Sequence, residues 1–119
     1  MRQPDDQALL LDMLMLARRV RERTERLSRE NFDDDDNLQL ATMHLIQSIG
    51  EAASRTSQQF RTSLPQIEWP AIIGMRHRLV HEYLRVSVDV VWATAIDDIP
   101  ALIAILERLV PPEDPEESA

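Results

Sequence analysis

The scarcity of glycine most constrains what this chain can fold into. Only two glycines, Gly50 and Gly74, occur in 119 residues. Tight β-turns rely on glycine for positive φ values, so a sheet built from hairpins would lack its usual turn residues. Aromatic residues make up only 4% of the chain, and Leu, Ile, Ala and Met are frequent, which favours helices over strands. We therefore expect an all-α protein.

The length fits one domain with a single core. We assign residues 1–112 to a helical domain and the acidic residues 113–119, which lack a core residue, to a disordered tail. The apolar runs are far shorter than the roughly 20 residues of a spanning helix, and the N-terminus does not resemble a signal peptide. The chain has no cysteine, which is compatible with a reducing compartment. We expect a cytoplasmic protein without a membrane partner.

Apolar residues at helical spacing predict the elements and their boundaries. The expected helices are Asp5 to about Ser28, Leu38 to about Ser57, about Ile67 to Leu84, and about Val90 to Leu109. Residues 31–37 are expected to form a connection whose aspartates cap the next helix, and residues 58–66 a loop closed by Pro65. Either Ser87 or Asp89 could cap the last helix, which Pro100 should kink.

The charge balance limits the nucleic acids that this chain could bind. The net charge is -8, which argues against broad binding to DNA or RNA, because that affinity comes mainly from contacts of basic residues with phosphates. The chain has no lysine, and most of its arginines cluster within residues 18–26 and 76–85. Arginine favours bidentate contacts with phosphate or carboxylate, so a local anion site is compatible with the overall charge. The first cluster is interpreted as a solvated helix end, with an RNA or partner surface as the alternative.

The segment RHRLVHEY at residues 76–83 carries the strongest chemical signal. Arg76 could hold a phosphate, and His81, whose side chain titrates near neutrality, could transfer a proton. In RNA the 2′-OH is a built-in nucleophile, so such a site would need no metal-bound water. The spacing alone is weak evidence, because Arg and His five residues apart occur on many helix surfaces.

Helical geometry predicts a partner for Arg76. On an ideal helix Arg76 lies in the centre of the apolar face, where a lone guanidinium would be strongly destabilising. A polar stripe at helical spacing follows the second expected helix: His44, Gln47, Ser48 and Glu51. Either this stripe faces solvent, or it is buried and Glu51 pairs with Arg76. His81 would lie about 140° round the helix from Arg76, near Gly74, where another helix could approach closely.

A metal site is not expected. His77 and His81 have the i, i+4 spacing of a zinc pair, but the only other histidine is His44 and nothing fixes further ligands.

Several ordered landmarks resemble one known family. They are Asn37-Leu-Gln-Leu-Ala, Ile49-Gly-Glu-Ala, Trp69 followed by residues 73–83, and Val90-Val-Trp. The chain resembles the HepT-like toxins, a branch of the HEPN superfamily, from the first helix to Pro111. The family's Arg-x4-His-x-Tyr element matches Arg76, His81 and Tyr83. His77 departs from the pattern, because that position is often Asn; it could substitute as a hydrogen-bond donor, or the nuclease activity could be weaker.

The resemblance implies an antiparallel bundle of four to five helices that dimerises and brings two Arg/His sets into one cleft. It implies a metal-independent endoribonuclease, the toxin of a toxin–antitoxin pair, with tRNA among the candidate RNA substrates and no cofactor for cleavage. The implied partner is a minimal nucleotidyltransferase antitoxin. This partner would use ATP and Mg to transfer AMP to Tyr83 and so silence the toxin.

We expect His81 to act as general base or acid, Arg76 to hold the scissile phosphate, and Tyr83 to contact RNA and serve as the off-switch. Glu51 would orient Arg76. His77, Gln47 and His44 complete the set of expected supporting residues. One alternative is a non-catalytic subunit that binds substrate or nucleotide for a minimal nucleotidyltransferase. Another is a degenerate helical dimer without a ligand.

Overall fold

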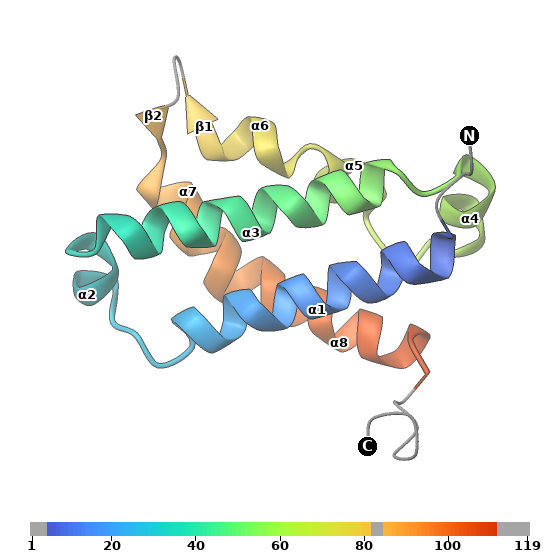
Figure 1. Cartoon of the computed structure of the whole chain (residues 1–119), viewed down its shortest axis with the longest axis horizontal. Helices are drawn as coiled ribbons and strands as arrows, with labels where there is room; N and C mark the ends of the chain where they lie inside the picture. The colour runs from blue at the N-terminus through green and yellow to red at the C-terminus, as the bar shows by residue number, and fades with distance from the viewer. Residues whose placement is uncertain (1–4, 82–84, 112–119) are drawn as a thin grey trace.

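Two long antiparallel helices, α1 (Asp6–Thr24) and α3 (Asp36–Ser54), form the centre of the fold. The computed structural model describes residues 5–81 and 85–111, with the backbone alone for Arg76, Val80, His81, Arg85 and Val86. Figure 1 shows α3 between α1 on one side and the short helices α5 and α6 on the other, while the C-terminal helical segment passes behind them. The expected all-α class is confirmed.

The remaining elements are short, except for the last helix. In chain order they are α2 (Arg29–Asp33), α4 (Gln58–Ser63), α5 (Trp69–Ile73), α6 (Met75–Leu79), β1 (Val80–His81), β2 (Arg85–Val86), α7 (Val88–Ala93), the π-helical turn η1 (Thr94–Asp98) and α8 (Ile99–Leu109). The two strands form one antiparallel pair, in which Val80 lies opposite Val86 and His81 opposite Arg85.

One hydrophobic core joins the N- and C-terminal halves of the chain. It collects fully buried aliphatic side chains from α1, α3 and α8, among them Met13, Ala17, Val20, Ile46, Ile49, Ala53, Ile99, Ile103 and Leu106. These residues recur every three or four positions, so each helix turns one continuous apolar stripe inward. The first helix is tied to the start of α4, because the Asp6 carboxylate accepts hydrogen bonds from the Ser57 N–H and hydroxyl at 2.8 and 2.7 Å.

Both predicted connections contain a helix. Asp35 caps α3 as expected, with its carboxylate accepting from the Leu38 N–H at 2.9 Å. The first predicted helix, however, ends at Thr24, and Ser28 caps the separate helix α2. Phe32 of α2 is fully buried and stacks obliquely on Trp92, with ring centroids 5.0 Å apart. The helix α4 in the predicted loop begins in the same way, with a serine cap, at Ser57.

Gln39 closes the connection between α2 and α3. Its side chain is 8% exposed, and its amide donates to the carbonyls of Phe32 at 2.9 Å and Asp33 at 3.0 Å. These carbonyls lie at the C-terminal end of α2, where the regular helical donors run out; the Phe32 carbonyl also accepts from the Asp35 N–H at 3.3 Å. The Gln39 side chain, near the start of α3, therefore donates hydrogen bonds to two carbonyls at the end of α2.

The irregularity predicted at Pro100 takes the form of a π turn. Proline has no N–H and cannot donate to the preceding turn. Immediately before it, the Ile99 N–H donates to the carbonyl of Thr94, five residues back, and the helix widens through η1. Ser87 lies at the cap position of α7 but makes no side-chain cap hydrogen bond.

Asp89, the other cap candidate, instead links α7 to α2. Its carboxylate accepts from the Arg29 guanidinium, which also donates to Asp33 at 2.7 Å. The hydrogen bonds with Asp89 and then Asp33 raise the pKa of Arg29 above its ordinary value.

The third predicted helix is wrong after Leu79. The chain leaves the helix there and enters β1, and the Ser87 N–H donates to the Leu79 carbonyl at 2.9 Å. Val80 and Val86, which lie opposite each other in the strand pair, are β-branched, and such residues favour extended backbone over helix. Local valine content therefore overrides the helical apolar pattern at this point.

The predicted tail at residues 113–119 lies outside the described residues, so its disorder stays a prediction. Within the described ranges no helix combines the length and apolar character needed to cross a membrane.

The first test concerns the buried amide of Gln39. Gln39→Ala should lower the free energy of unfolding by about 1–3 kcal/mol, because the carbonyls of Phe32 and Asp33 each lose a hydrogen bond from the buried amide. Urea unfolding measures this loss. Gln59→Ala, at an exposed position of α4, is the control and should stay within about 0.5 kcal/mol of the parent. Equal stability of the two variants would contradict the capping role.

Candidate active site

Arg76 and His81 lie on different backbone elements. Arg76 and His77 belong to α6, whereas His81 belongs to β1, where it pairs with Arg85. The expected angle of about 140° between Arg76 and His81 assumed one continuous helix and is wrong, because α6 ends at Leu79.

The side chains of Arg76 and His81 are outside the described part of the structure, and so is Tyr83. Their expected roles stay predictions. His77, whose side chain is described, is exposed on α6. Among the described residues, no three or more His, Cys, Asp or Glu side chains are grouped so that they could hold a metal ion.

The polar stripe of α3 points away from the core. His44 and Glu51 are exposed, and Gln47 and Ser48 are half-buried. The buried stripe of the same helix, which includes Thr42, Ile46, Ile49 and Ala53, occupies the opposite face. In the single chain the stripe therefore lies on the surface, while the pairing of Glu51 with Arg76 stays a prediction, because the Arg76 side chain lies outside the described part of the structure. Leu40, one turn earlier on this face, is 49% exposed.

Gly50 brings α5 and α6 against α3. A Cβ atom at Gly50 would lie 2.9 Å from the backbone carbonyl oxygen of Ile72, closer than Cβ atoms pack. Both α5 and α6 contact α3. The close approach was expected at Gly74, and this is wrong. A Cβ at Gly74 would meet only the Pro70 and Ala71 carbonyls of its own segment among the described atoms, the nearer at 3.1 Å.

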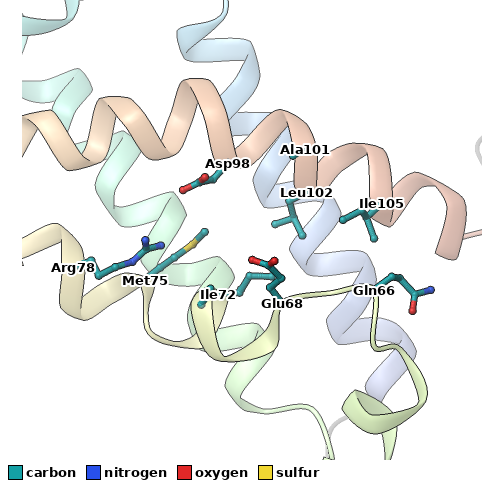
Figure 2. Close-up of a pocket in the computed structure, with 10 residues that line it drawn as sticks. Gln66, Glu68, Ile72, Met75, Arg78, Asp98, Ala101, Leu102 and Ile105 are labelled. Carbon is teal, nitrogen blue, oxygen red and sulfur yellow. The ribbon is translucent and has the colours of Figure 1, made fainter.

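A groove that the sequence did not predict separates α5 and α6 from η1 and α8. It has a volume of about 330 Å³. Figure 2 shows its walls, which carry the apolar side chains Ile72, Met75, Leu102 and Ile105, with Ala71 and Ala101. The polar lining consists of Gln66, Glu68, Arg78 and Asp98. Sequence reasoning missed the groove because its two walls are about 20 to 40 residues apart, and no motif joins them.

The family model "Ribonuclease HepT-like" matches residues 13–109, which span α1 to the end of α8. The chain therefore belongs to the HepT-like family of ribonucleases.

Individual relatives cover most of the chain. "Probable ribonuclease HepT" of Thermococcus cleftensis is 34% identical over 76% of this chain and 82% of its own length. "Putative RNase TTE0752" of Caldanaerobacter subterraneus is 36% identical over 68% of this chain and 72% of its own length. "Putative RNase MJ1380" of Methanocaldococcus jannaschii is 28% identical over 82% of this chain and 90% of its own length. No solved structure matches the chain at a significant level.

The contact at Gly50 provides a test of how the site is supported. Gly50→Ala should lower the free energy of unfolding by about 1–3 kcal/mol, because the added methyl group forces α5 away from α3. Thermal unfolding measures the loss. Ser48→Ala on the same helix is the control, since its hydroxyl bonds only the carbonyl of His44. An unchanged melting temperature for Gly50→Ala would show that α3 and α5 can separate without cost.

Proposed function

We propose that this chain is a metal-independent endoribonuclease toxin whose site is completed by a second copy of the chain. The family supplies the class, ribonuclease. One observation carries the assignment within the chain: α6 stops at Leu79 and turns directly into the β1–β2 pair. Arg76 and His81 are thereby attached to two short elements joined without a loop, and the match to the Arg-x4-His-x-Tyr element is complete.

The proposed cleavage step uses only groups of the protein and the RNA. His81 acts as the general base that takes the proton of the 2′-OH, and the 2′ oxygen attacks the adjacent phosphorus. A P–O bond forms, the bond to the 5′ oxygen breaks, and a general acid protonates the leaving oxygen. Arg76 holds the phosphate and offsets the charge that develops on its oxygens.

A second copy would supply the group that one chain lacks. One histidine cannot remove and deliver a proton in the same step, so a second His81 is the natural acid. The outward face of α3 supports such a dimer, because it combines the exposed Leu40 with polar side chains of His44, Gln47 and Glu51. Two Arg76 residues in one cleft would also provide local positive charge in a chain with a net charge of -8.

Regulation would act on Tyr83. In the proposed reaction, a minimal nucleotidyltransferase antitoxin with ATP and Mg directs the Tyr83 hydroxyl onto the α-phosphorus of ATP. A tyrosine O–P bond forms, pyrophosphate leaves, and the phenolic proton passes to a base of the partner. The AMP group adds bulk and negative charge where the RNA phosphate should bind, and both effects oppose RNA binding.

Substitution of the two proposed catalytic residues tests the site. With tRNA in EDTA, Arg76→Ala should slow cleavage by about 100- to 1,000-fold. His81→Ala should slow it by about 100- to 10,000-fold. Gel-resolved initial rates measure both effects. Arg19→Ala removes an exposed arginine of α1 and should cleave like the parent.

Two results would count against this assignment. If Arg76→Ala and His81→Ala both cleave at the parental rate, these residues are not catalytic. If the parent never cleaves RNA yet binds the nucleotidyltransferase tightly, the chain is a non-catalytic binding subunit.

Regulation has its own test. Tyr83→Phe removes the hydroxyl that would accept AMP, so this variant should stay active after incubation with the nucleotidyltransferase, ATP and Mg. Intact mass and remaining RNA cleavage report modification and silencing separately. Modification and silencing of Tyr83→Phe to the parental extent would place the acceptor elsewhere.

A further inference from the structure

The groove between α5, α6, η1 and α8 has no part in the proposed cleavage step. We propose that it is a specificity pocket that holds a guanine base of the bound RNA, within a few nucleotides of the phosphate to be cleaved. This inference rests on the proposed ribonuclease function for its biological meaning. The pocket itself is argued from the described side chains.

The walls of the groove suit a flat ring. Ile72 and Met75 face Leu102 and Ile105 across it (Figure 2). Its volume of about 330 Å³ is at the lower end of the range of roughly 300–1,000 Å³ that is usual for ligand pockets. Proteins that read single-stranded RNA take splayed-out bases between apolar side chains and hydrogen-bond their edges. A single base therefore fits both the size and the apolar character of the walls.

The polar side chains that line the groove determine which base it would bind. Glu68 comes from the start of α5 and Asp98 from η1 on the facing wall, and both carboxylates turn toward the groove with the guanidinium of Arg78 (Figure 2). Among the described residues, no ion pair joins Arg78 to either carboxylate. All three groups are therefore available to a ligand. Two carboxylates disfavour a phosphate in the groove but accept well from N–H donors.

Guanine matches this arrangement of charges. Its N1–H and N2 amino group are adjacent donors that a single carboxylate can accept, and its O6 and N7 are adjacent acceptors for an arginine. Adenine, cytosine and uracil lack the combination of a two-donor edge with a two-acceptor edge. Guanine can pair with all three charged groups, because the second hydrogen of its N2 amino group remains for the other carboxylate. With any of the other bases, at least one charged group of the groove would stay unpaired, and that selects against them.

The position of Arg78 connects the groove to the cleavage site. Arg78 follows Arg76 by two residues in α6, a rise of about 3 Å along the helix. Two positions apart on a helix also means about 200° apart around its axis, so Arg76 and Arg78 are placed on different sides of α6. A base held at Arg78 would thus belong to a nucleotide a few positions away from the phosphate held by Arg76. On the other wall, Asp98 is the last residue of the π turn, and such turns are frequent at functional sites. Its neighbour Asp97 is also exposed but does not line the groove.

The first arm of the test is cleavage. Short RNAs that differ only in the base at one position, varied in turn within a few nucleotides of the cleaved bond, are incubated in EDTA with the parent and with three variants. At one such position the parent should cleave RNA with guanine at least about tenfold faster than RNA with adenine, cytosine or uracil. Asp98→Asn and Glu68→Gln should remove this preference by slowing cleavage at guanine alone. Asp97→Asn, the matched control, should keep it. Equal rates at all four bases, or an unchanged preference in both groove variants, would overturn the proposal.

The second arm is binding, which does not depend on activity. GMP and AMP are titrated into the intact protein while the methyl signals of Ile72, Met75 and Ile105 are followed by NMR. GMP should shift these signals with at least about tenfold higher affinity than AMP, and Asp98→Asn should abolish the difference. If the parent cleaves no RNA, the ribonuclease proposal fails. Guanine-selective shifts would then support the pocket as a site for a free guanine nucleotide, and their absence would overturn it. Selective GMP binding without any base preference in cleavage would likewise overturn the role in RNA specificity.

Discussion

The contact between α3 and α5 at Gly50 is the interaction on which the rest of the structure depends. Only a residue without Cβ lets the Ile72 carbonyl lie so close, since a Cβ there would be 2.9 Å from its oxygen. This approach seats α5, and with it α6, on the outer side of α3. The α6–β1 segment with Arg76 and His81, and the wall of the groove with Ile72, Met75 and Arg78, both follow from that placement.

Helical periodicity predicted the long elements well, because each buries a continuous apolar stripe. The all-α class and the Asp35 cap are confirmed. Segments in which the residues' local backbone preference competes with the helical apolar spacing were not predicted. Val80 pairs with Val86 in a strand pair, although the apolar helical pattern runs through Val80 to Leu84. The close approach was expected at Gly74 rather than Gly50, because a sequence does not reveal which helices will pack together.

The residues of the candidate site could be predicted from the sequence, but their arrangement in space could not. The Arg76–Tyr83 segment has a recognisable spacing, whereas its geometry depends on the end of α6 and on the strand pair. The outward direction of the α3 stripe could not be decided from sequence, because apolar residues flank it on both sides. The groove could not be predicted from the sequence for a different reason. Only tertiary packing brings Arg78 and Asp98 to the same groove, and Asp98 belongs to the π turn that precedes Pro100.

The central claim is that His81 and Arg76 drive attack by the RNA's own 2′-OH without a metal ion. Analysis of the product ends in EDTA tests this claim most directly, with an RNA that carries a single 2′-deoxy nucleotide at the cleaved position as comparison. The account predicts 2′,3′-cyclic phosphate and 5′-hydroxyl ends from the all-ribose RNA, and no cleavage at the 2′-deoxy position. Products with 5′-phosphate ends, or cleavage of the 2′-deoxy RNA at the same bond, would contradict it.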